Sequence, residues 1–175
     1  MINDPDLFRE VSEYVTVEEK SFANAISVDF EDGDIFARFG ISAQIDLALK
    51  KEFQMNSGAH LVFEQTEALV SVDVNSGSKL NHSDSNVGGA DAQDQLAIQV
   101  NMEAAELIPS QLRLRNLAGL IVIDFINMSS TEAHDQVLAA LERGLLEDPA
   151  TTRVDGFSDH GVVQLTRSRA GKSLH

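Results

Sequence analysis

The sequence predicts a mixed α/β (α+β) fold, in which a sheet is covered by helices. Two observations lead to this prediction. Apolar residues recur at helical spacing in some segments, and short apolar runs typical of strands separate those segments. The chain has 175 residues, of which 43% are hydrophobic and 23% are charged. This length predicts one domain, or one domain with a small appendage, and is sufficient to bury a core.

The first part of the chain, 1–56, is predicted to contain two helices and an extended stretch. Residues 4–6 read Asp-Pro-Asp, which is typical of a helix start because Pro is favoured in the first turn. The alternating stretch 25–30 predicts a strand, and apolar spacing predicts a second helix over 41–53. An Asn-Ser-Gly sequence then marks a boundary with the rest of the chain, 57–175.

Two strand-like runs follow this boundary, at 60–66 and 68–74, and one residue separates them. A tight hairpin fits this spacing best. The next segment, 76–93, is rich in Ser, Asn, Asp and Gly and predicts a long mobile loop. A helix is expected over 94–115, where Pro109 should kink it or split it in two.

The most apolar run of the sequence, 118–128, predicts a buried strand. Ser129 and Glu132 have the spacing of a capping box at the start of another helix. Two further strands are expected at 153–157 and 162–165. These elements complete a pattern in which helices alternate with strands.

Charge and cysteine content restrict the function and the location. Lys and Arg number 13 against 28 Asp and Glu, which gives a net charge of −15. A nucleic-acid binder is usually basic over its footprint, so this chain would need metal ions, a local basic patch or a partner to approach phosphates. The chain has no cysteine, which excludes disulfides and thiolate metal sites. Because no signal peptide pattern and no membrane-spanning apolar run are visible, we expect a cytoplasmic protein.

Two aspartates lie inside apolar strands and form the candidate site. Asp73 interrupts one apolar run and Asp124 the most apolar one, and a buried carboxylate is costly unless it is paired, hydrogen-bonded or bound to metal. The strand period places Asn75 on the same side as Asp73, so all three converge at one rim if the strands are neighbours. Two carboxylates and an amide oxygen suit Mg²⁺. Alternatively, each aspartate ends its strand and caps a turn or helix.

Two basic clusters are the candidate RNA contacts, namely Arg113 with Arg115 and Arg167 with Arg169. The alternative is that these side chains are solvated surface charges. The five histidines are scattered without metal-ligand spacing. The sequence also has no Ser-His-Asp set, phosphate-binding loop or dinucleotide fingerprint.

Five segments together resemble one known family. They read TEALVSVDVNSG (66–77), NMEAA (101–105), QLRLRNLAGLIVIDFI (111–126), TRSR (166–169) and IFARFGI (35–41). Over about 35–172, their content and order are similar to those of the ribonuclease E/G family. The resemblance implies a deoxyribonuclease I-like catalytic subdomain over 57–175. It also implies that 1–56 corresponds to the end of the family's RNase H-like part.

The resemblance also implies a chemistry. The family's two metal-binding aspartates match Asp73 and Asp124, and its supporting asparagine matches Asn75. The implied activity is a Mg²⁺-dependent endoribonuclease that cuts single-stranded, often A/U-rich RNA and leaves 5′-phosphate products. Mg²⁺ would position the scissile phosphate and activate a water molecule.

Several family features do not match this sequence. The family's OB-fold RNA-binding domain, 5′-end sensor and zinc-linking Cys motif have no counterpart, so any homo-oligomer would form without a zinc link. The segment 78–91 lacks the arginines that the family carries there. Three functions therefore stay open: the Mg²⁺-dependent endoribonuclease, a non-catalytic interaction or regulatory module that keeps the fold, and a metal-dependent phosphodiesterase acting on a small substrate.

Overall fold

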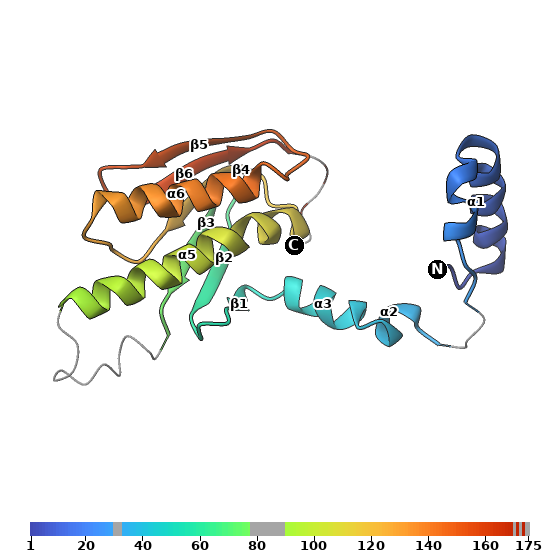
Figure 1. The fold of residues 1–175 in the computed structure, drawn as a ribbon, viewed down its shortest axis with the longest axis horizontal. Coiled ribbons are helices and arrows are strands. Elements are labelled where there is room, and N and C mark those ends of the chain that lie inside the picture. The colour runs from blue at the N-terminus through green and yellow to red at the C-terminus, as the bar shows by residue number, and fades with distance from the viewer. Residues whose placement is uncertain (30–32, 78–89, 170, 172, 174–175) are drawn as a thin grey trace. The chain divides into compact units, whose positions relative to one another are not determined.

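The computed structural model of the chain describes residues 1–29, 33–77, 90–169, 171 and 173. Its helices are α1 (Pro5–Glu18), the 3-10 helix η1 (Lys20–Ala25), α2 (Ile35–Arg38), α3 (Ile41–Ala48), α5 (Ala90–Leu114) and α6 (Thr131–Leu145). Its strands are β1 (Glu52–Gln54), β2 (His60–Gln65), β3 (Leu69–Asn75), β4 (Gly119–Asp124), β5 (Thr152–Phe157) and β6 (Val162–Arg167) (Figure 1). The predicted mixed α+β fold is confirmed.

The chain forms two compact units, Met1–Ile45 and Asp46–His175. In the first unit, α1 starts where predicted, at Pro5. Asp4 caps it, because its Oδ1 accepts hydrogen bonds from two backbone N–H groups in the first turn, each at 2.9 Å. The predicted strand at 25–30 is wrong. The helix η1 reaches the first residue of this stretch, and Val28 forms only an isolated bridge with Ile2. The last residue of the stretch lies outside the described residues.

The second unit contains a six-stranded sheet with the order β1-β2-β3-β4-β6-β5. Strands β3 and β4 are parallel, and the other neighbouring pairs are antiparallel. The predicted β2–β3 hairpin is confirmed. The two strands expected at 153–157 and 162–165 are also present, as β5 and β6, and they pair with each other in antiparallel orientation. Since parallel neighbours need a crossover connection, the long helix α5 joins β3 to β4. Helices α5 and α6 lie together on one face of the sheet (Figure 1).

Two predicted elements differ from the structure because tertiary contacts override local patterns. The helix predicted over 41–53 ends at Ala48, and β1 follows it and pairs with β2. Helix α5 continues through Pro109 instead of splitting. A Cβ atom on Gly144 of α6 would lie 2.7 Å from Pro109 Cγ, so the two helices approach closely at this point.

The helix starts also differ from the prediction. Helix α5 begins at Ala90, inside the predicted loop 76–93, and most of that loop lies outside the described residues. Helix α6 is capped by Ser130, whose Oγ accepts a hydrogen bond from Ala133 N at 3.0 Å. The capping box predicted at Ser129 is therefore wrong by one residue.

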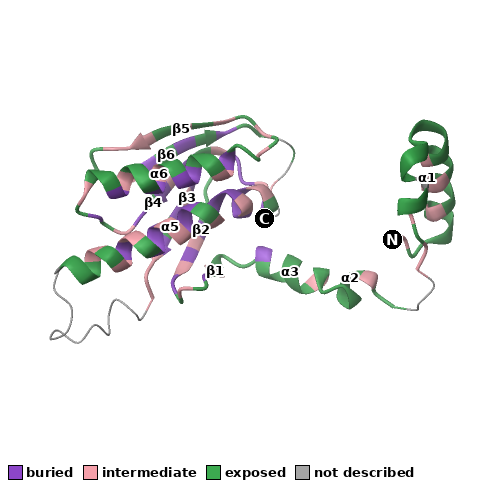
Figure 2. Cartoon of the chain, in the orientation of Figure 1, coloured by how far each residue is buried: buried purple, intermediate pink, exposed green. Residues whose placement is uncertain are grey.

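The core lies between the sheet and its two helices (Figure 2). Residues of β2, β3, β4 and β6 alternate between this core and the opposite face. The core's fully buried aliphatic residues include Leu61, Val70, Val72, Ile108, Leu112, Ile121, Ile123, Leu141 and Leu165. In the described part of the chain, no helix has the length and apolar character needed to cross a membrane.

Candidate active site

Asp73 and Asp124 lie directly opposite each other on the parallel strands β3 and β4. Neighbouring strands are about 4.8 Å apart, and in-register residues point to the same face of a sheet. In β3, Val72 and Val74 are buried against the helices, so Asp73 between them is exposed on the other face. Asp124 is likewise exposed and follows the buried Ile123. The structure thus brings both predicted carboxylates together on the face of the sheet opposite α5 and α6.

Asn75 joins this pair at the carboxyl end of β3. Its Nδ2 donates a hydrogen bond of 2.6 Å to Asp73 Oδ2. This contact confirms that the two side chains share a face, as the strand period predicts. It also leaves the Asn75 amide oxygen and the other Asp73 oxygen for further contacts. His60 on β2 lies directly opposite Asn75.

The donor set of this site fits a hard divalent cation. Asp73, Asp124 and Asn75 offer only oxygen ligands, which suit Mg²⁺. Within the described residues, no group of three or more acidic, histidine or cysteine side chains is arranged to hold a metal. Two carboxylates are compatible with Mg²⁺, because it usually keeps several waters and substrate phosphates among its ligands.

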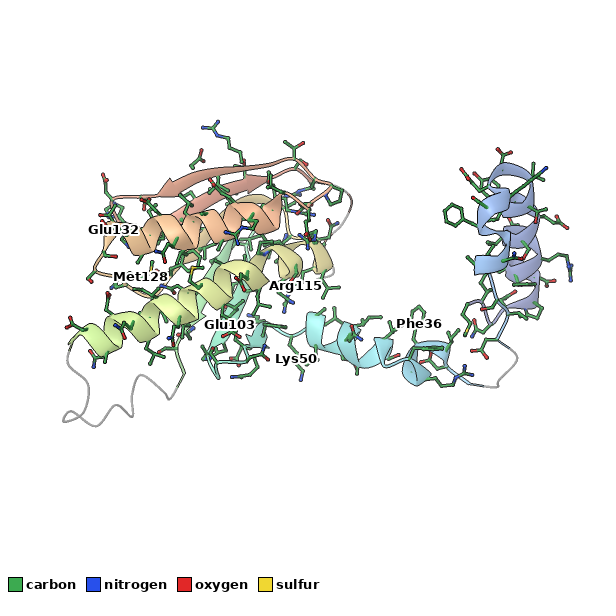
Figure 3. All side chains as sticks on the ribbon, viewed as in Figure 1. Phe36, Lys50, Glu103, Arg115, Met128 and Glu132 are labelled. Atoms are coloured by element: carbon green, nitrogen blue, oxygen red, sulfur yellow. The ribbon has the colours of Figure 1, made fainter. Side chains whose placement is uncertain are left out.

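The turn between β1 and β2 supports the same edge of the sheet. Glu103 on α5 (Figure 3) accepts hydrogen bonds from the backbone N–H groups of Asn56 and Ser57, at 2.7 and 3.2 Å. Gly77, two residues after Asn75, packs against this turn. A Cβ on Gly77 would lie 2.7 Å from the carbonyl oxygen of Gly58.

The four predicted RNA-contacting arginines lie away from this edge. Arg167 is opposite Gly119, at the start of β4, whereas Asp124 is at its end. Five residue steps along a strand correspond to roughly 16 Å. Arg169 follows β6 and is exposed. Arg113, at the end of α5, is half-buried and donates to the carbonyl oxygen of Gly144 at 3.1 Å.

Two of these arginines are buried inside the unit. Arg115 is 0% exposed, packs its guanidinium 4.4 Å from the centre of the Phe63 ring and binds the backbone oxygen of Lys50 (Figure 3). Burial lowers the pKa of Arg115. Arg167 is also buried, and its guanidinium binds Asp148. Neither buried guanidinium can reach an RNA phosphate in this structure.

Sequence reasoning did not identify two residues near the site, His60 and Asn101. His60 is placed by the β2–β3 register, which a single sequence does not specify. Asn101 is a fully buried amide on α5 whose side chain binds the backbone of Ile126, just after β4. The sequence signal that could have identified Asn101 was its position, as a polar residue, on the otherwise apolar side of α5.

The comparisons with known proteins agree with the resemblance seen in the sequence. A model of the ribonuclease E/G family matches residues 1–170. The chain is 39% identical to Ribonuclease G of Escherichia coli (strain K12) over 140 residues, which are 80% of this chain and 27% of that protein. It is 34% identical over 167 residues to Ribonuclease G of Haemophilus influenzae, covering 95% of this chain and 32% of that protein.

A plant relative is similar over nearly the whole chain. The Ribonuclease E/G-like protein, chloroplastic, of Arabidopsis thaliana is 30% identical over 174 residues, which are 99% of this chain and 17% of that protein. The chain thus spans about a third or less of the length of the curated relatives described here. Because the family model matches almost the entire sequence, the chain belongs to the ribonuclease E/G family.

Proposed function

We propose that this protein is a Mg²⁺-dependent endoribonuclease that cleaves single-stranded RNA in RNA processing or decay and leaves 5′-phosphate products. The observation that carries this proposal is the side-by-side placement of Asp73 and Asp124 on the face of the sheet opposite α5 and α6. The names Ribonuclease G and Ribonuclease E among the relatives support RNA as the substrate. The cytoplasmic location expected from the sequence, and a homo-oligomer without a zinc link, remain predictions.

Each residue of the site has a separate role in this proposal. Asp73 and Asp124 would hold Mg²⁺, which when bound supplies orientation of the scissile phosphate and neutralises the charge that develops on its oxygens. Asn75 holds Asp73 in one orientation through its 2.6 Å hydrogen bond. Its amide oxygen would accept a hydrogen bond from the attacking water.

Mg²⁺ is important here because the chain is acidic. With a net charge of −15, the protein repels phosphate at long range, and two exposed carboxylates at the site add to this repulsion. Among the predicted arginines, Arg169 is exposed just after β6, beyond the strand end that pairs with the start of β4. We propose that it contacts a phosphate several nucleotides from the cleaved bond, whereas the site itself depends on the cation.

The test is cleavage of a 3′-fluorescent, A/U-rich single-stranded RNA by the purified full chain, with Mg²⁺ and with EDTA. Mass spectrometry of the products identifies the 5′-phosphate. We expect Mg²⁺-dependent cleavage that Asp73→Asn and Asp124→Asn abolish. Asp135→Asn is the matched control, because Asp135 is an exposed residue of α6 that makes the same charge change elsewhere. Cleavage that continues in EDTA, or that survives both substitutions at the site, would contradict the proposal.

The alternative is a non-catalytic module that keeps the fold. The burial of Arg115 and Arg167 favours it, since two of the four predicted RNA-contacting cations serve the protein's own structure. This alternative predicts no cleavage of any single-stranded RNA by the wild-type chain at saturating Mg²⁺, together with a folded protein. The same assay therefore decides between the two functions.

A further inference from the structure

A buried amide on α5 binds the chain just beyond β4. Asn101 is 0% exposed. Its Nδ2 donates a hydrogen bond of 2.7 Å to the carbonyl oxygen of Ile126, and its Oδ1 accepts one of 3.0 Å from the Ile126 N–H. One side chain thus satisfies both backbone polar groups of one residue, which a neighbouring strand would normally do.

The sheet ladder itself ends two residues earlier. The pairing of β4 stops at Asp124, which lies opposite Asp73 on one side and Val162 on the other. After that point the polar backbone groups of Ile126 would be left unpaired in a half-buried position, which is costly. Asn101 therefore holds the end of the strand where the ladder can no longer do so.

A second contact from α5 ties down the same connection. The two carboxylate oxygens of Asp94 accept hydrogen bonds of 2.8 Å from the backbone N–H and the hydroxyl of Ser129. Ser129 lies three residues after Ile126. The segment between β4 and α6 is thus held to α5 at both of its ends.

We propose that Asn101 is a positioning residue for Asp124, a role that rests on the proposed function. Asp124 is held by the sheet ladder before it and by the Asn101–Ile126 contact after it. Because the planar amide of Asn101 binds both the N–H and the carbonyl oxygen of Ile126, it restricts the position and the backbone conformation of that residue. This limits the directions in which the Asp124 carboxylate, two residues earlier, can point. Displacement of a catalytic group by about 1 Å can lower a rate by about 100-fold.

Packing alone does not account for an asparagine at this position. The neighbouring buried positions of α5, Val100, Ala104 and Ile108, are apolar, and an apolar residue at 101 would also fill the space. The amide is needed only for its bonds to Ile126. This predicts that its loss affects the site more than an equally destabilising loss elsewhere in the helix.

The experiment compares three variants of the full chain. Asn101→Leu keeps a similar volume and removes both hydrogen bonds. Asn101→Asp keeps the acceptor for the Ile126 N–H and loses the donor, and it carries the test if the leucine variant does not fold. Ile108→Ala is the control, because it removes packing from the same helix at a fully buried position. All measurements are made well below each variant's melting temperature.

Three quantities are measured: kcat and KM for cleavage of the A/U-rich RNA, the Mg²⁺ dissociation constant, and hydrogen exchange of the backbone amides. We expect Asn101→Leu to lower kcat or Mg²⁺ affinity by about 10- to 100-fold, the usual effect of removing a residue that orients a metal ligand. KM for RNA should change less than threefold. Exchange at Ile126 should become faster relative to Ile121 and Ile123. Asn101→Asp should show a smaller change in the same direction.

The control makes the two explanations separable. If Ile108→Ala lowers kcat and Mg²⁺ affinity as much as Asn101→Leu at the same loss of melting temperature, Asn101 has only a structural role and the proposal is overturned. If the wild-type chain neither binds Mg²⁺ nor cleaves RNA, the proposed function fails, and the role of Asn101 in it fails too. An active wild type with unchanged kcat and Mg²⁺ affinity in both Asn101 variants overturns the Asn101 role alone.

Discussion

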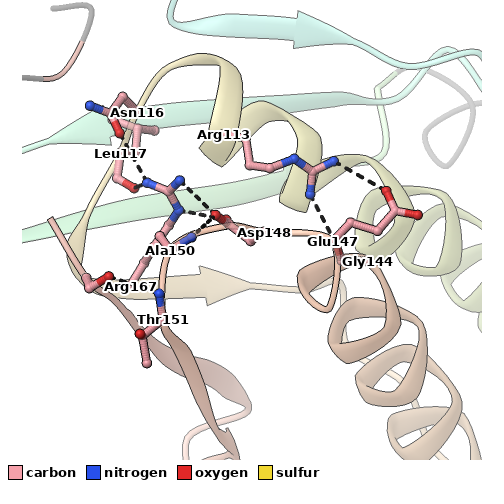
Figure 4. A network of polar contacts seen from close by, with 10 residues as sticks. Arg113, Asn116, Leu117, Gly144, Glu147, Asp148, Ala150, Thr151 and Arg167 are labelled. Atoms are coloured by element: carbon pink, nitrogen blue, oxygen red, sulfur yellow. Dashed lines mark hydrogen bonds and ion pairs between the residues drawn. The ribbon is translucent and has the colours of Figure 1, made fainter. Parts of the chain in front are cut away.

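Arg167 on β6 and Asp148, in the turn before β5, form a buried bidentate ion pair. Arg167 Nε lies 2.8 Å from Asp148 Oδ2, and Nη2 lies 3.0 Å from Oδ1 (Figure 4). Their side chains are 4% and 0% exposed. Nη1 also donates to the carbonyl oxygen of Leu117 at 3.0 Å. The pair therefore links β6 to the chain segments that enter β4 and β5, and Arg167 belongs to the fold.

Breaking this pair should cost much more than removing another buried arginine. Arg167→Met leaves the Asp148 carboxylate buried without its counterion, so we expect the free energy of unfolding to fall by about 3–5 kcal/mol. Arg115→Met is the matched comparison, since Arg115 binds the neutral acceptors Gln111 and Lys50 O. It should cost about 1–2 kcal/mol. Urea unfolding measures both values, and equal losses would show that the ion pair is not the cause of the difference.

The same pair should make stability depend on acid pH. Burial by itself raises the pKa of Asp148. Hydrogen bonds from Arg167 and Ala150, together with the charges of Arg167 and Arg113, lower this pKa by more than burial raises it. The pKa of Asp148 therefore lies below its usual value. A lowered native pKa contributes stability that is present above the unfolded pKa of about 3.9. This stability is lost as the pH falls through the native pKa.

Urea unfolding of wild type and Asp148→Asn from pH 7 to pH 2 measures this effect. The difference in the free energy of unfolding should be constant near neutrality and shrink below about pH 4. A difference that stays the same down to pH 2 would show that the charge of Asp148 does not contribute to stability.

Mg²⁺ should stabilise the folded protein through Asp73 and Asp124. At a Mg²⁺ concentration 100 times the dissociation constant, binding should raise the free energy of unfolding by about 2.7 kcal/mol. This stabilisation is detected as a rise in melting temperature. Asp73→Asn and Asp124→Asn should abolish this rise. Without metal, both variants should be as stable as wild type or slightly more stable, because two adjacent carboxylates repel each other. If instead the aspartates are structural caps, both variants will be destabilised and Mg²⁺ will not change the wild-type melting temperature.

Asn75→Ala should lower the cleavage rate more than the Mg²⁺ affinity. Its hydrogen bond orients Asp73, and loss of such an orienting partner typically costs about 10- to 100-fold in activity or affinity. Because both carboxylates remain, we expect most of this loss in single-turnover rate and little in the dissociation constant from calorimetry. A loss of Mg²⁺ affinity as large as the loss of rate would instead identify Asn75 as a metal ligand.

Gly77→Ala should be more damaging than Gly40→Ala. Both glycines have positive φ, +65° and +68°, so both alanines are strained by about 1 kcal/mol. Only Gly77 also has a neighbour in the way, the Gly58 carbonyl oxygen at 2.7 Å from the added Cβ, whereas Gly40 faces open space. We expect Gly77→Ala to lose at least about 1 kcal/mol more in urea unfolding. Equal losses in the free energy of unfolding would mean that the β1–β2 turn moves away from the added Cβ without destabilising the fold.

Several features were determined by the sequence alone because they depend on neighbours along the chain. The β2–β3 hairpin, β4 and α6 follow from apolar periodicity and turn residues. The shared face of Asp73 and Asn75 follows from the strand period of two. The start of α1 at Pro5 follows from the preference of Pro for the first turn of a helix.

Other features were decided only by the tertiary structure, since they depend on contacts between distant segments. The register that places Asp73 opposite Asp124 joins two strands that are far apart along the chain. Arg115 and Arg167 resemble surface cations in the sequence, but helix and strand packing buries them. A local sequence pattern gives the charge of a residue and the face of the helix or strand on which it lies. Its burial and its contact partners depend on how the elements pack together.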